Sequence, residues 1–458
     1  MFARKGSMWI SAMAAPLAAV MLSGCVPGMS NSTAAGQAGA GRVVTDPGAM
    51  GKTRIRVLDY FAGGPDKAWM ERIVTAFERK YPQITVDRTA QSWDDVMKSL
   101  PLKLRAADPP DIVPANNGWQ SLGTLAKGGL VLDLDPYAEA YGWKKAFPTS
   151  IQEEHQFAPD GKEMGTGSLF GAPIARGSAV EVYYNRSLLK RTGGHVPRTL
   201  AQFEENMRKA KAAGITPVAV GNLEQGGVTA TLFSLINSFG DRDRIADFTY
   251  SRGDMSVGRT GFPEAVTKLK EWAGKGYFTK DFAAVPGQDA AQAFVDGKAL
   301  FRFDYSGSLP LQQGDSKKLG SFVLPRAHGG DPVVTFAAAS NFSIAAKTKH
   351  PDAAAAFLNF MASPEAARIA TQVGSMPMLS TPELPPDHDP LLADEVKIAA
   401  RVSDNDSAVP YLDWATPTLL NTMTTHMTDL LAGKASAADV VKATQDDYAQ
   451  FQKTRKAK

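Results

Sequence analysis

Arg54-Ile55-Arg56-Val57-Leu58-Asp59-Tyr60 is the stretch of sequence that decides the fold. Apolar and polar side chains alternate along it, which is typical of a strand, and the turn residues Gly63-Gly64-Pro65 follow. Apolar residues then recur at the spacing of a helix that ends at Tyr81-Pro82: Trp69, Met70, Ile73, Val74 and Phe77. A strand that passes into an amphipathic helix is the unit of parallel sheets covered by helices.

The same unit repeats further along the chain. Ile84-Thr85-Val86 is predicted as a second strand, 96–107 as a helix, and Asp111-Ile112-Val113 as a third strand. A second α/β region runs to about Leu324, with predicted strands 179–184, 217–220 and 299–304 and predicted helices 200–213, 230–239 and 290–294. Because 458 residues are too many for one compact core, the sequence predicts an α/β protein with two lobes, each a mainly parallel sheet flanked by helices.

The C-terminal part is predicted as an extended stretch followed by helices. Residues 333–344 are extended, and a helix over 351–361 begins with proline in its first turn. Ser363 is the expected N-cap of the next helix, which reaches Val373. The chain is then rich in loops up to Trp414 and helical beyond it.

The N-terminus has the layout of a secretory signal. Arg4 and Lys5 precede a short apolar run that ends in Leu22-Ser23-Gly24-Cys25, and Cys25 is the only cysteine of the chain. This ending resembles the lipobox of bacterial lipoproteins, which implies that residues 1–24 are removed and Cys25 is acylated. A plain signal followed by a chance cysteine is the alternative. Residues 25–51 are rich in Gly, Ser and Ala and are predicted to form a flexible tether.

Composition excludes several classes of protein. The net charge of +3 falls to +1 when Arg4 and Lys5 are removed, so no strong field attracts nucleic acid. Without a second cysteine the body has no disulfide, and no later stretch approaches the ~20 apolar residues of a membrane-spanning helix. The sequence indicates no cofactor.

Several segments, taken together in their order, resemble one family. They are Ala68-Trp69-Met70, Phe77-Glu78-Arg79-Lys80-Tyr81-Pro82, Pro109-Pro110-Asp111-Ile112, Gly171-Ala172-Pro173, Tyr183-Tyr184-Asn185-Arg186-Ser187-Leu188-Leu189, Phe294-Val295-Asp296-Gly297-Lys298-Ala299, Ser343-Ile344, His350-Pro351-Asp352-Ala353-Ala354, Phe357-Leu358 and Ser363-Pro364-Glu365-Ala366. The chain resembles the extracellular solute-binding proteins of ABC importers, in the carbohydrate-binding family 1 that includes maltose-binding protein.

The resemblance implies a fold of two lobes with the ligand in the cleft between them. Lobe 1 would hold 52–178 and 342–374, and lobe 2 would hold 179–334 and 375–458. The hinge crossovers would lie near 176–180, 335–341 and 374–378. It also implies a monomer, lipid-anchored at the outer face of the bacterial cytoplasmic membrane. Its partners would be a carbohydrate and permease subunits with a cytoplasmic ATPase.

Candidate ligand-binding residues follow from the rule that ligands lie beyond the carboxyl ends of the strands of an open α/β sheet. Aromatic rings stack on the C–H faces of a sugar, and amides and carboxylates bind its hydroxyl groups. The residues after the predicted strands, with Trp414 from the tail, offer that mixture: Tyr60, Phe61, Gln91, Trp93, Asn116, Asn117, Trp119, Asp304, Tyr305 and Trp414. Asn341 joins them because it lies in an implied crossover.

Four of these residues have a structural alternative. Trp93 fits a hydrophobic staple at the start of a helix as well as a ligand contact. Trp119 fits packing against Leu122 and Leu125, Asp304 fits the cap of a turn, and Asn341 fits a hinge residue. In many carbohydrate binders of this family a stacking tryptophan follows the strand after Asp-Gly-Lys. Here Tyr305 stands nearby instead, which leaves the identity of the sugar open.

No enzyme motif stands out. The six histidines include no pair at metal-binding spacing, and the chain has no nucleophile elbow and no phosphate-binding loop. Carboxylates are plentiful, so a lipid-anchored glycoside hydrolase is the alternative function. An adhesive surface lipoprotein is the third hypothesis. The sequence favours the binding protein and predicts neither catalytic residues nor a metal site.

Overall fold

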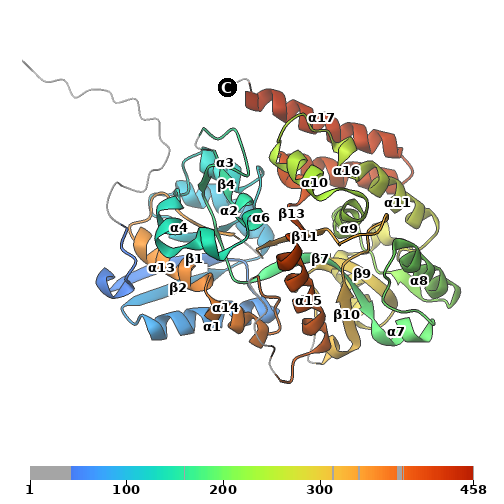
Figure 1. Cartoon of the computed structure of the whole chain (residues 1–458), viewed down its shortest axis with the longest axis horizontal. Helices are drawn as coiled ribbons and strands as arrows, with labels where there is room; N and C mark the ends of the chain where they lie inside the picture. Colours follow the sequence, from blue (N-terminus) through green and yellow to red (C-terminus); the bar gives the residue numbers. More distant parts are fainter. Residues whose placement is uncertain are drawn as a thin grey trace, which may run out of the picture. The chain divides into compact units, whose positions relative to one another are not determined.

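The computed structural model describes residues 43–158, 160–311, 314–338, 341–378, 384 and 386–456. Two mixed sheets carry helices on their faces, so the predicted α/β fold class is confirmed (Figure 1). Sheet 1 has the strand order β2-β1-β3-β12-β6, and sheet 2 has the order β13-β11-β7-β9-β8 with β10 also paired to β7. A separate hairpin joins β4 and β5.

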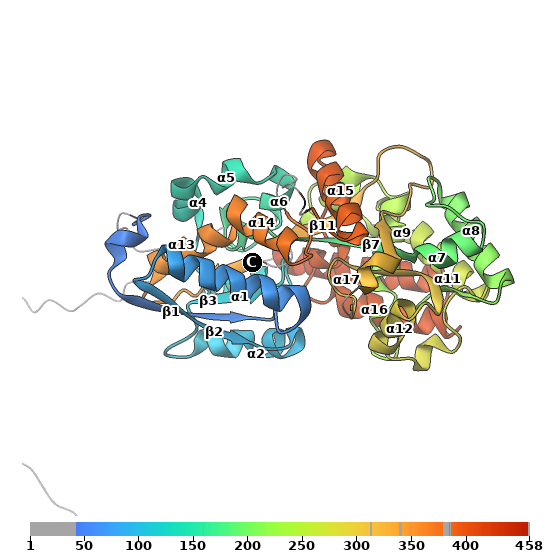
Figure 2. The same ribbon diagram turned by 90° about the horizontal axis from the view of Figure 1, so that it is seen from below.

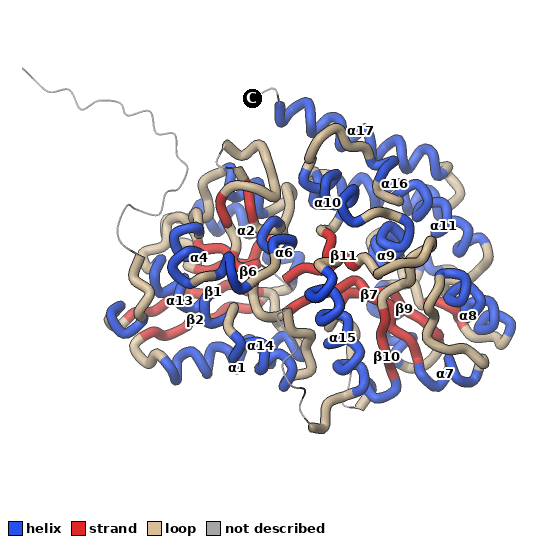
Figure 3. Tube along the Cα trace, viewed as in Figure 1, coloured by secondary structure: helices blue, strands red, loops and turns tan. Residues whose placement is uncertain are grey.

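The structure bounds each element as follows. The strands, drawn in red in Figure 3, are β1 (Thr53–Asp59), β2 (Ile84–Ala90), β3 (Ile112–Ala115), β4 (Gln156–Phe157), β5 (Ser168–Leu169), β6 (Ala172–Pro173), β7 (Gly177–Asn185), β8 (Thr216–Val218), β9 (Ala299–Tyr305), β10 (Leu319–Phe322), β11 (Val334–Ala338), β12 (Asn341–Ile344) and β13 (Ala408–Val409). The α-helices are α1 (Gly64–Lys80), α2 (Trp93–Arg105), α3 (Leu122–Lys127), α4 (Asp135–Tyr141), α5 (Trp143–Ala146), α6 (Thr149–Glu153), α7 (Arg186–Arg191), α8 (Leu200–Ala212), α9 (Thr229–Phe239), α10 (Arg242–Tyr250), α11 (Phe262–Gly274), α12 (Gly287–Val295), α13 (Pro351–Met361), α14 (Pro364–Gln372), α15 (Pro390–Asn405), α16 (Leu419–Leu431) and α17 (Ala437–Lys456). The 3-10 helices are η1 (Pro47–Met50), η2 (Val257–Arg259), η3 (Phe282–Ala284), η4 (Asp315–Lys318) and η5 (Leu412–Ala415).

Sheet 1 brings the ends of its strands to one edge. β1 pairs in parallel with both β2 and β3, so their carboxyl ends lie together. β12 runs antiparallel to β3, and its first residue, Asn341, is paired with Ala115 at that same edge. Successive side chains of β1 point to opposite faces of the sheet, and helices cover both faces. Val57 faces the core of α1 and α13, whereas Leu58 faces α2. Figure 2 shows α1 and α2 on opposite sides of these strands.

Helix α2 begins three residues earlier than the sequence predicts. Ser92 is its N-cap, since the hydroxyl oxygen of Ser92 accepts a hydrogen bond of 3.2 Å from the backbone N–H of Asp95. Trp93 therefore lies in the first turn of α2. The residue of a hydrophobic staple precedes the N-cap, and that position holds Gln91, so the staple interpretation of Trp93 is wrong.

Sheet 2 is built around the long strand β7. One edge of β7 pairs with β9, and the other pairs first with β11 and then with β10, all antiparallel. Sheet 2 is therefore mixed rather than mainly parallel as predicted, because these three strands each run back along β7. The apolar residues of α8, α9 and α11 pack on this sheet around Phe203 and Trp272. The predicted helix 351–361 and the predicted Ser363 cap of α14 match the structure. Both helices, α13 and α14, pack in the core of sheet 1 rather than on sheet 2.

Three segments run side by side where the chain passes between the sheets. β7 begins at Gly177, directly after the β6 region of sheet 1, and its first residues pair with 336–338 of β11. The backbone N–H of Gly177 donates to the carbonyl of Met376 at 3.0 Å, and that of Met378 donates to the carbonyl of Ala175 at 3.0 Å. The hinge crossovers and the lobe boundaries implied by the resemblance stay predictions.

The folded body begins before residue 52. Residues 43–51 were expected in the flexible tether, but η1 lies here with Pro47 buried, and Val43 and Met50 pack against the core of sheet 1. The side-chain amide of Gln83 donates to the carbonyl of Pro47 at 2.6 Å. The signal, Cys25 and the rest of the tether lie outside the described residues. Within the described part of the chain, no helix is both long and apolar enough to span a bilayer.

Candidate ligand-binding site

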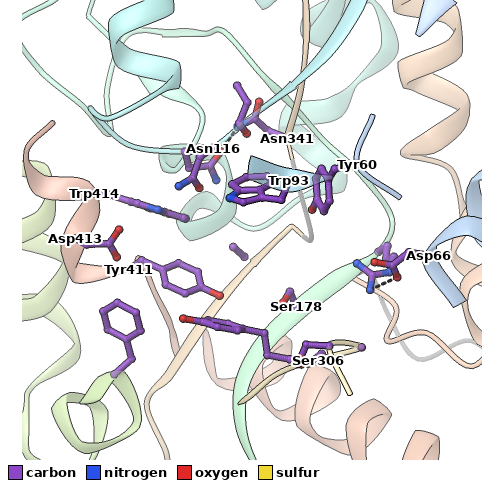
Figure 4. Close-up of a pocket in the computed structure, with 18 of the residues that line it drawn as sticks. Tyr60, Asp66, Trp93, Asn116, Ser178, Ser306, Asn341, Tyr411, Asp413 and Trp414 are labelled. Carbon is purple, nitrogen blue, oxygen red and sulfur yellow. Dashed lines mark hydrogen bonds and ion pairs between the residues drawn. The ribbon is translucent and has the colours of Figure 1, made fainter. Parts of the chain in front are cut away.

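A cavity of about 480 Å³ lies where sheet 1, sheet 2 and η5 meet. Figure 4 shows the labelled side chains gathered around it. Its lining residues are Tyr60, Asp66, Trp93, Ala115, Asn116, Asn117, Arg176, Ser178, Phe233, Tyr305, Ser306, Gly307, Ser308, Ala337, Asn341, Tyr411, Asp413, Trp414 and Leu420. Seven of the predicted residues are among them: Tyr60, Trp93, Asn116, Asn117, Tyr305, Asn341 and Trp414.

The first wall of the cavity comes from the strand ends of sheet 1. Tyr60 follows β1, Trp93 opens α2 after β2, and Asn116 follows β3. The rings of Tyr60 and Trp93 meet edge to face with their centroids 4.7 Å apart. Trp93 is 36% exposed, which is unusual for so large an apolar side chain. This wall thus offers an accessible indole that the protein core does not require.

The second wall is a cluster of aromatic rings centred on η5. Tyr411 lies 4.9 Å from Trp414 and 5.4 Å from Phe233 of α9, measured between ring centroids. Tyr305, the last residue of β9, lies 6.1 Å from Tyr411. The hydroxyl of Tyr305 is within hydrogen-bond distance of the Thr229 hydroxyl, at 3.2 Å. Four rings from three separate parts of the chain therefore form one surface.

The two walls are joined by a short loop from sheet 1. The backbone N–H of Trp119 donates to the carbonyl of Trp414 at 3.1 Å. Gly118, at a φ of +85°, lies so close to η5 that an added Cβ would stand 2.4 Å from the Cβ of Trp414. Glycine at this position permits both the left-handed backbone and the close approach of the two segments.

The amides of Asn117 and Asn341 are used within the protein. Asn341 donates through Nδ2 to the side-chain oxygen of Asn117 and, at 2.8 Å, to the carbonyl of Ala115. Its own side-chain oxygen accepts from Ser343 at 3.3 Å. Both side chains are buried, so this network holds the cavity wall rather than offering groups to a ligand.

Glu154 supports the same network from behind. The Nδ2 of Asn117 donates to its carboxyl group at 3.3 Å, and Glu154 is 1% exposed. Burial raises the pKa of Glu154 well above its usual range, which favours the uncharged form of the group. Asn116, the neighbour of Asn117, is only half-buried and has no side-chain hydrogen bond to the residues that the structure describes.

Three charged side chains line the cavity. Arg176 and Asp66 form an ion pair of 2.5 Å, and the guanidinium of Arg176 also lies 5.5 Å from the ring of Phe61. Asp413 of η5 is 4% exposed and accepts a hydrogen bond of 3.1 Å from the side-chain amide of Gln120. Burial raises the pKa of Asp413 to about 7. Two carboxyl groups and one guanidinium therefore face the space.

The comparisons with known proteins fit this geometry. Residues 62–368 match the family described as bacterial extracellular solute-binding protein. This chain belongs to that family. The solute-binding protein is 25% identical over 320 residues to the multiple sugar-binding protein of Streptococcus mutans, which covers 68% of this chain and 72% of the relative. It is 22% identical over 411 residues to an ABC transporter extracellular-binding protein of Pyrococcus horikoshii, covering 86% of each chain.

Solved structures share the fold of the solute-binding protein. A chitin oligosaccharide binding protein superposes with a TM-score of 0.71 at 20% identity, over 87% of this chain and 99% of the other. The protein RafE in complex with raffinose gives a TM-score of 0.64 at 21% identity, over 87% and 99% of the two chains. The family and these neighbours are binding proteins rather than enzymes.

Four predicted residues of the solute-binding protein lie away from the cavity. Phe61 is fully buried in the core against Trp69 and Phe342. Trp119 is 3% exposed and packs against Phe157 and Phe451. These two rings fill apolar space beneath the wall, so the core interpretation of Trp119 holds.

The other two displaced residues have polar partners elsewhere. The side-chain oxygen of Gln91 accepts from the ammonium of Lys103 at 2.6 Å. Asp304 pairs with Arg302 at 2.6 Å within β9, and it accepts from the backbone N–H of Tyr305. Neither side chain lines the cavity.

Sequence reasoning also missed several lining residues. Phe233, Tyr411 and Asp413 line the second wall. Arg176 also lines the cavity, and Figure 4 shows its ion-pair partner Asp66 on the other side from Asp413. The run Tyr411-Leu412-Asp413-Trp414 carried a signal, because it repeats the mixture of rings and a carboxylate seen after the strands. Arg176 was a second signal, because it interrupts a run of small and apolar residues that ends in Ala175. An arginine in such a run is rarely buried without a partner.

A metal site finds no support in the described ranges. No group of three His, Cys, Asp or Glu side chains is gathered there in a way that would hold an ion.

Proposed function

We propose that this solute-binding protein captures a mono- or oligosaccharide and delivers it to the permease of an ABC-type importer. The observation that carries the proposal is the cavity with six aromatic side chains drawn from strand ends of both sheets, from helices α2 and α9 and from the η5 segment: Tyr60, Trp93, Phe233, Tyr305, Tyr411 and Trp414. Rings on opposing walls fit the two C–H faces of a sugar, and amides and carboxyl groups fit its hydroxyls. The names of the Streptococcus mutans relative and of the chitin oligosaccharide and raffinose binders support a sugar ligand.

The proposed mechanism is closure of two lobes around the ligand. Lobe 1 would comprise 52–178 and 342–374, and lobe 2 would comprise 179–334 and 375–458. They would pivot at the three adjacent segments near 176–180, 335–341 and 374–378. A ligand that contacts both walls favours the closed arrangement, because only there does it gain all of its contacts. The closed form is then recognised by a permease with a cytoplasmic ATPase.

The proposal places the protein outside the cell as a monomer. Cys25 would carry the lipid anchor at the outer face of the cytoplasmic membrane, and the tether would raise the concentration of the body near its permease. The protein would need no cofactor and would not transform its ligand.

Calorimetry against neutral sugars tests the proposal. We expect saturable binding of at least one of raffinose, maltotriose, xylotriose and N,N′-diacetylchitobiose, with no product on chromatography after prolonged incubation. Hydrolysis would establish the glycosidase alternative, and no binding by any sugar would contradict the proposal.

A matched pair of variants locates the site. Trp93→Ala should weaken binding by about 0.5–1.5 kcal/mol, the usual range for an aromatic contact. Leu102→Ala is the control, since Leu102 lies on the same helix and is 76% exposed but does not line the cavity. Equal affinities of the two variants would remove the cavity from consideration as the sugar site.

A further inference from the structure

Asp413 differs from the other charged groups of the cavity in having no ion-pair partner among the residues that the structure describes. Asp66 is neutralised by Arg176 at 2.5 Å. No ion pair of Asp413 occurs among the described residues, and its side-chain partner there is the neutral amide of Gln120. With Asp413 ionised, the cavity therefore carries one net negative charge from three charged side chains.

The groups around Asp413 add no compensating charge. Tyr305 of β9 and Tyr411, the N-cap of η5, remain neutral, because burial raises the pKa of each hydroxyl above its usual value. From α10, Tyr250 is likewise held neutral by burial. The side of α9 at the cavity presents Phe233, and that of α16 presents Leu420.

The carboxyl group has room for further hydrogen bonds. A carboxylate offers about four acceptor positions, and Asp413 accepts from the Gln120 amide at 3.1 Å and from its own backbone N–H. Figure 4 shows Asp413 beside Trp414 and Tyr411, at the ring surface on which a sugar would lie. Donors arriving from a ligand would replace the solvation that burial has removed from the carboxylate.

We infer that Asp413 selects the ligand, accepting hydrogen bonds from the hydroxyl groups of a neutral sugar and excluding sugars that carry a carboxylate or phosphate. This inference rests on the proposed sugar-binding function. An anionic sugar would place a like charge next to a buried carboxylate, where low dielectric strengthens repulsion. Hydroxyl donors, by contrast, stabilise the ionised form of Asp413.

The selection predicts a proton linkage with a definite sign. In the free protein burial raises the pKa of Asp413 to about 7, and hydroxyl donors of the ligand lower it in the complex. The complex therefore holds fewer protons than the free protein below that pH. Affinity should rise by roughly tenfold from pH 6 to pH 8, since one pH unit below the pKa only about a tenth of the group is ionised.

Calorimetry at pH 6 and pH 8, in buffers of different ionisation enthalpy, tests the inference on the unaltered protein. We use the strongest binder among raffinose, maltotriose, xylotriose and N,N′-diacetylchitobiose, with trigalacturonate as the acidic probe. The expected result is proton release at pH 6, about tenfold tighter binding of the neutral sugar at pH 8 than at pH 6, and weaker binding of trigalacturonate than of the neutral sugar at pH 8. A flat pH response, or preference for the acidic sugar, would overturn the inference.

The variant Asp413→Asn separates this role from a structural one. It keeps the shape and an acceptor for Gln120 but cannot ionise, so affinity at pH 8 should fall at least tenfold and the pH dependence should vanish. Asp331→Asn, at an exposed loop position outside the cavity, is the control and should behave as the unaltered protein. Unchanged affinity and pH dependence in Asp413→Asn would refute the inference while leaving sugar binding intact. If the unaltered protein bound no sugar of either class, the proposed function itself would fail.

Discussion

The two walls of the cavity satisfy their polar groups in opposite ways. On the sheet 1 wall, Asn117 and Asn341 bond to each other and to their surroundings, with Glu154 behind them. On the η5 wall, Asp413 is buried with a single side-chain donor and faces the cavity. The buried amides of the first wall therefore hold its shape. On the second wall, Asp413 can accept further hydrogen bonds, and we infer that it supplies polar selection of the ligand.

Gly118→Ala should break the contact between the walls and have the largest effect. A Cβ would meet the Cβ of Trp414 at 2.4 Å, and alanine would also hold an unfavourable φ of +85°. We expect about 2–5 kcal/mol lower stability in urea unfolding, together with weaker ligand binding, because η5 must move.

Gly193→Ala is the matched control for that change. Gly193 has a φ of +64° with nothing within 4 Å of its added Cβ, so only the backbone cost of about 1–2 kcal/mol remains. If both variants lost the same stability, the close approach of Gly118 to Trp414 would not contribute to the effect of Gly118→Ala.

Asn117→Ala should act on stability more than on binding. Its removal leaves the buried carboxyl of Glu154 and the amide of Asn341 with fewer partners, which should lower the free energy of unfolding by about 1–3 kcal/mol. Thermal and urea unfolding measure this loss. A variant of normal stability with abolished ligand binding would show that the sheet 1 wall recognises the ligand directly.

Asn116→Ala, one residue away, should show the reverse pattern and the smallest effect. Its half-buried side chain lines the cavity without a hydrogen bond to other described residues, so stability should stay within about 0.5 kcal/mol. Calorimetry with the bound sugar should show a loss of about 0.5–1.5 kcal/mol in binding. Loss of stability without loss of affinity would assign Asn116 to the framework instead.

Much of the first wall could be predicted because it depends on strand ends. The pattern of β1 and α1 located Tyr60, and the rule for parallel sheets placed Asn116 and Trp93 at the same edge. The rule could not distinguish Tyr60 from Phe61. The side chains of successive residues at the end of a strand point in different directions. The ring of Phe61 packs in the core against Trp69 and Phe342, whereas Tyr60 lines the cavity.

The sequence by itself determined the α/β class, the proline start of α13, the Ser363 cap of α14 and the edge at which the cavity would form. These features depend on residues a few positions apart, whose periodicity and capping chemistry are local. Only the tertiary structure decided that Asn341 would be engaged by Asn117, 224 positions away, and that Gln120 would be the donor to Asp413 across 293 positions. Such distant contacts decide which polar groups remain available to a ligand. A polar side chain that is hydrogen-bonded within the protein is less available to a ligand, and the local sequence does not show whether that bond forms.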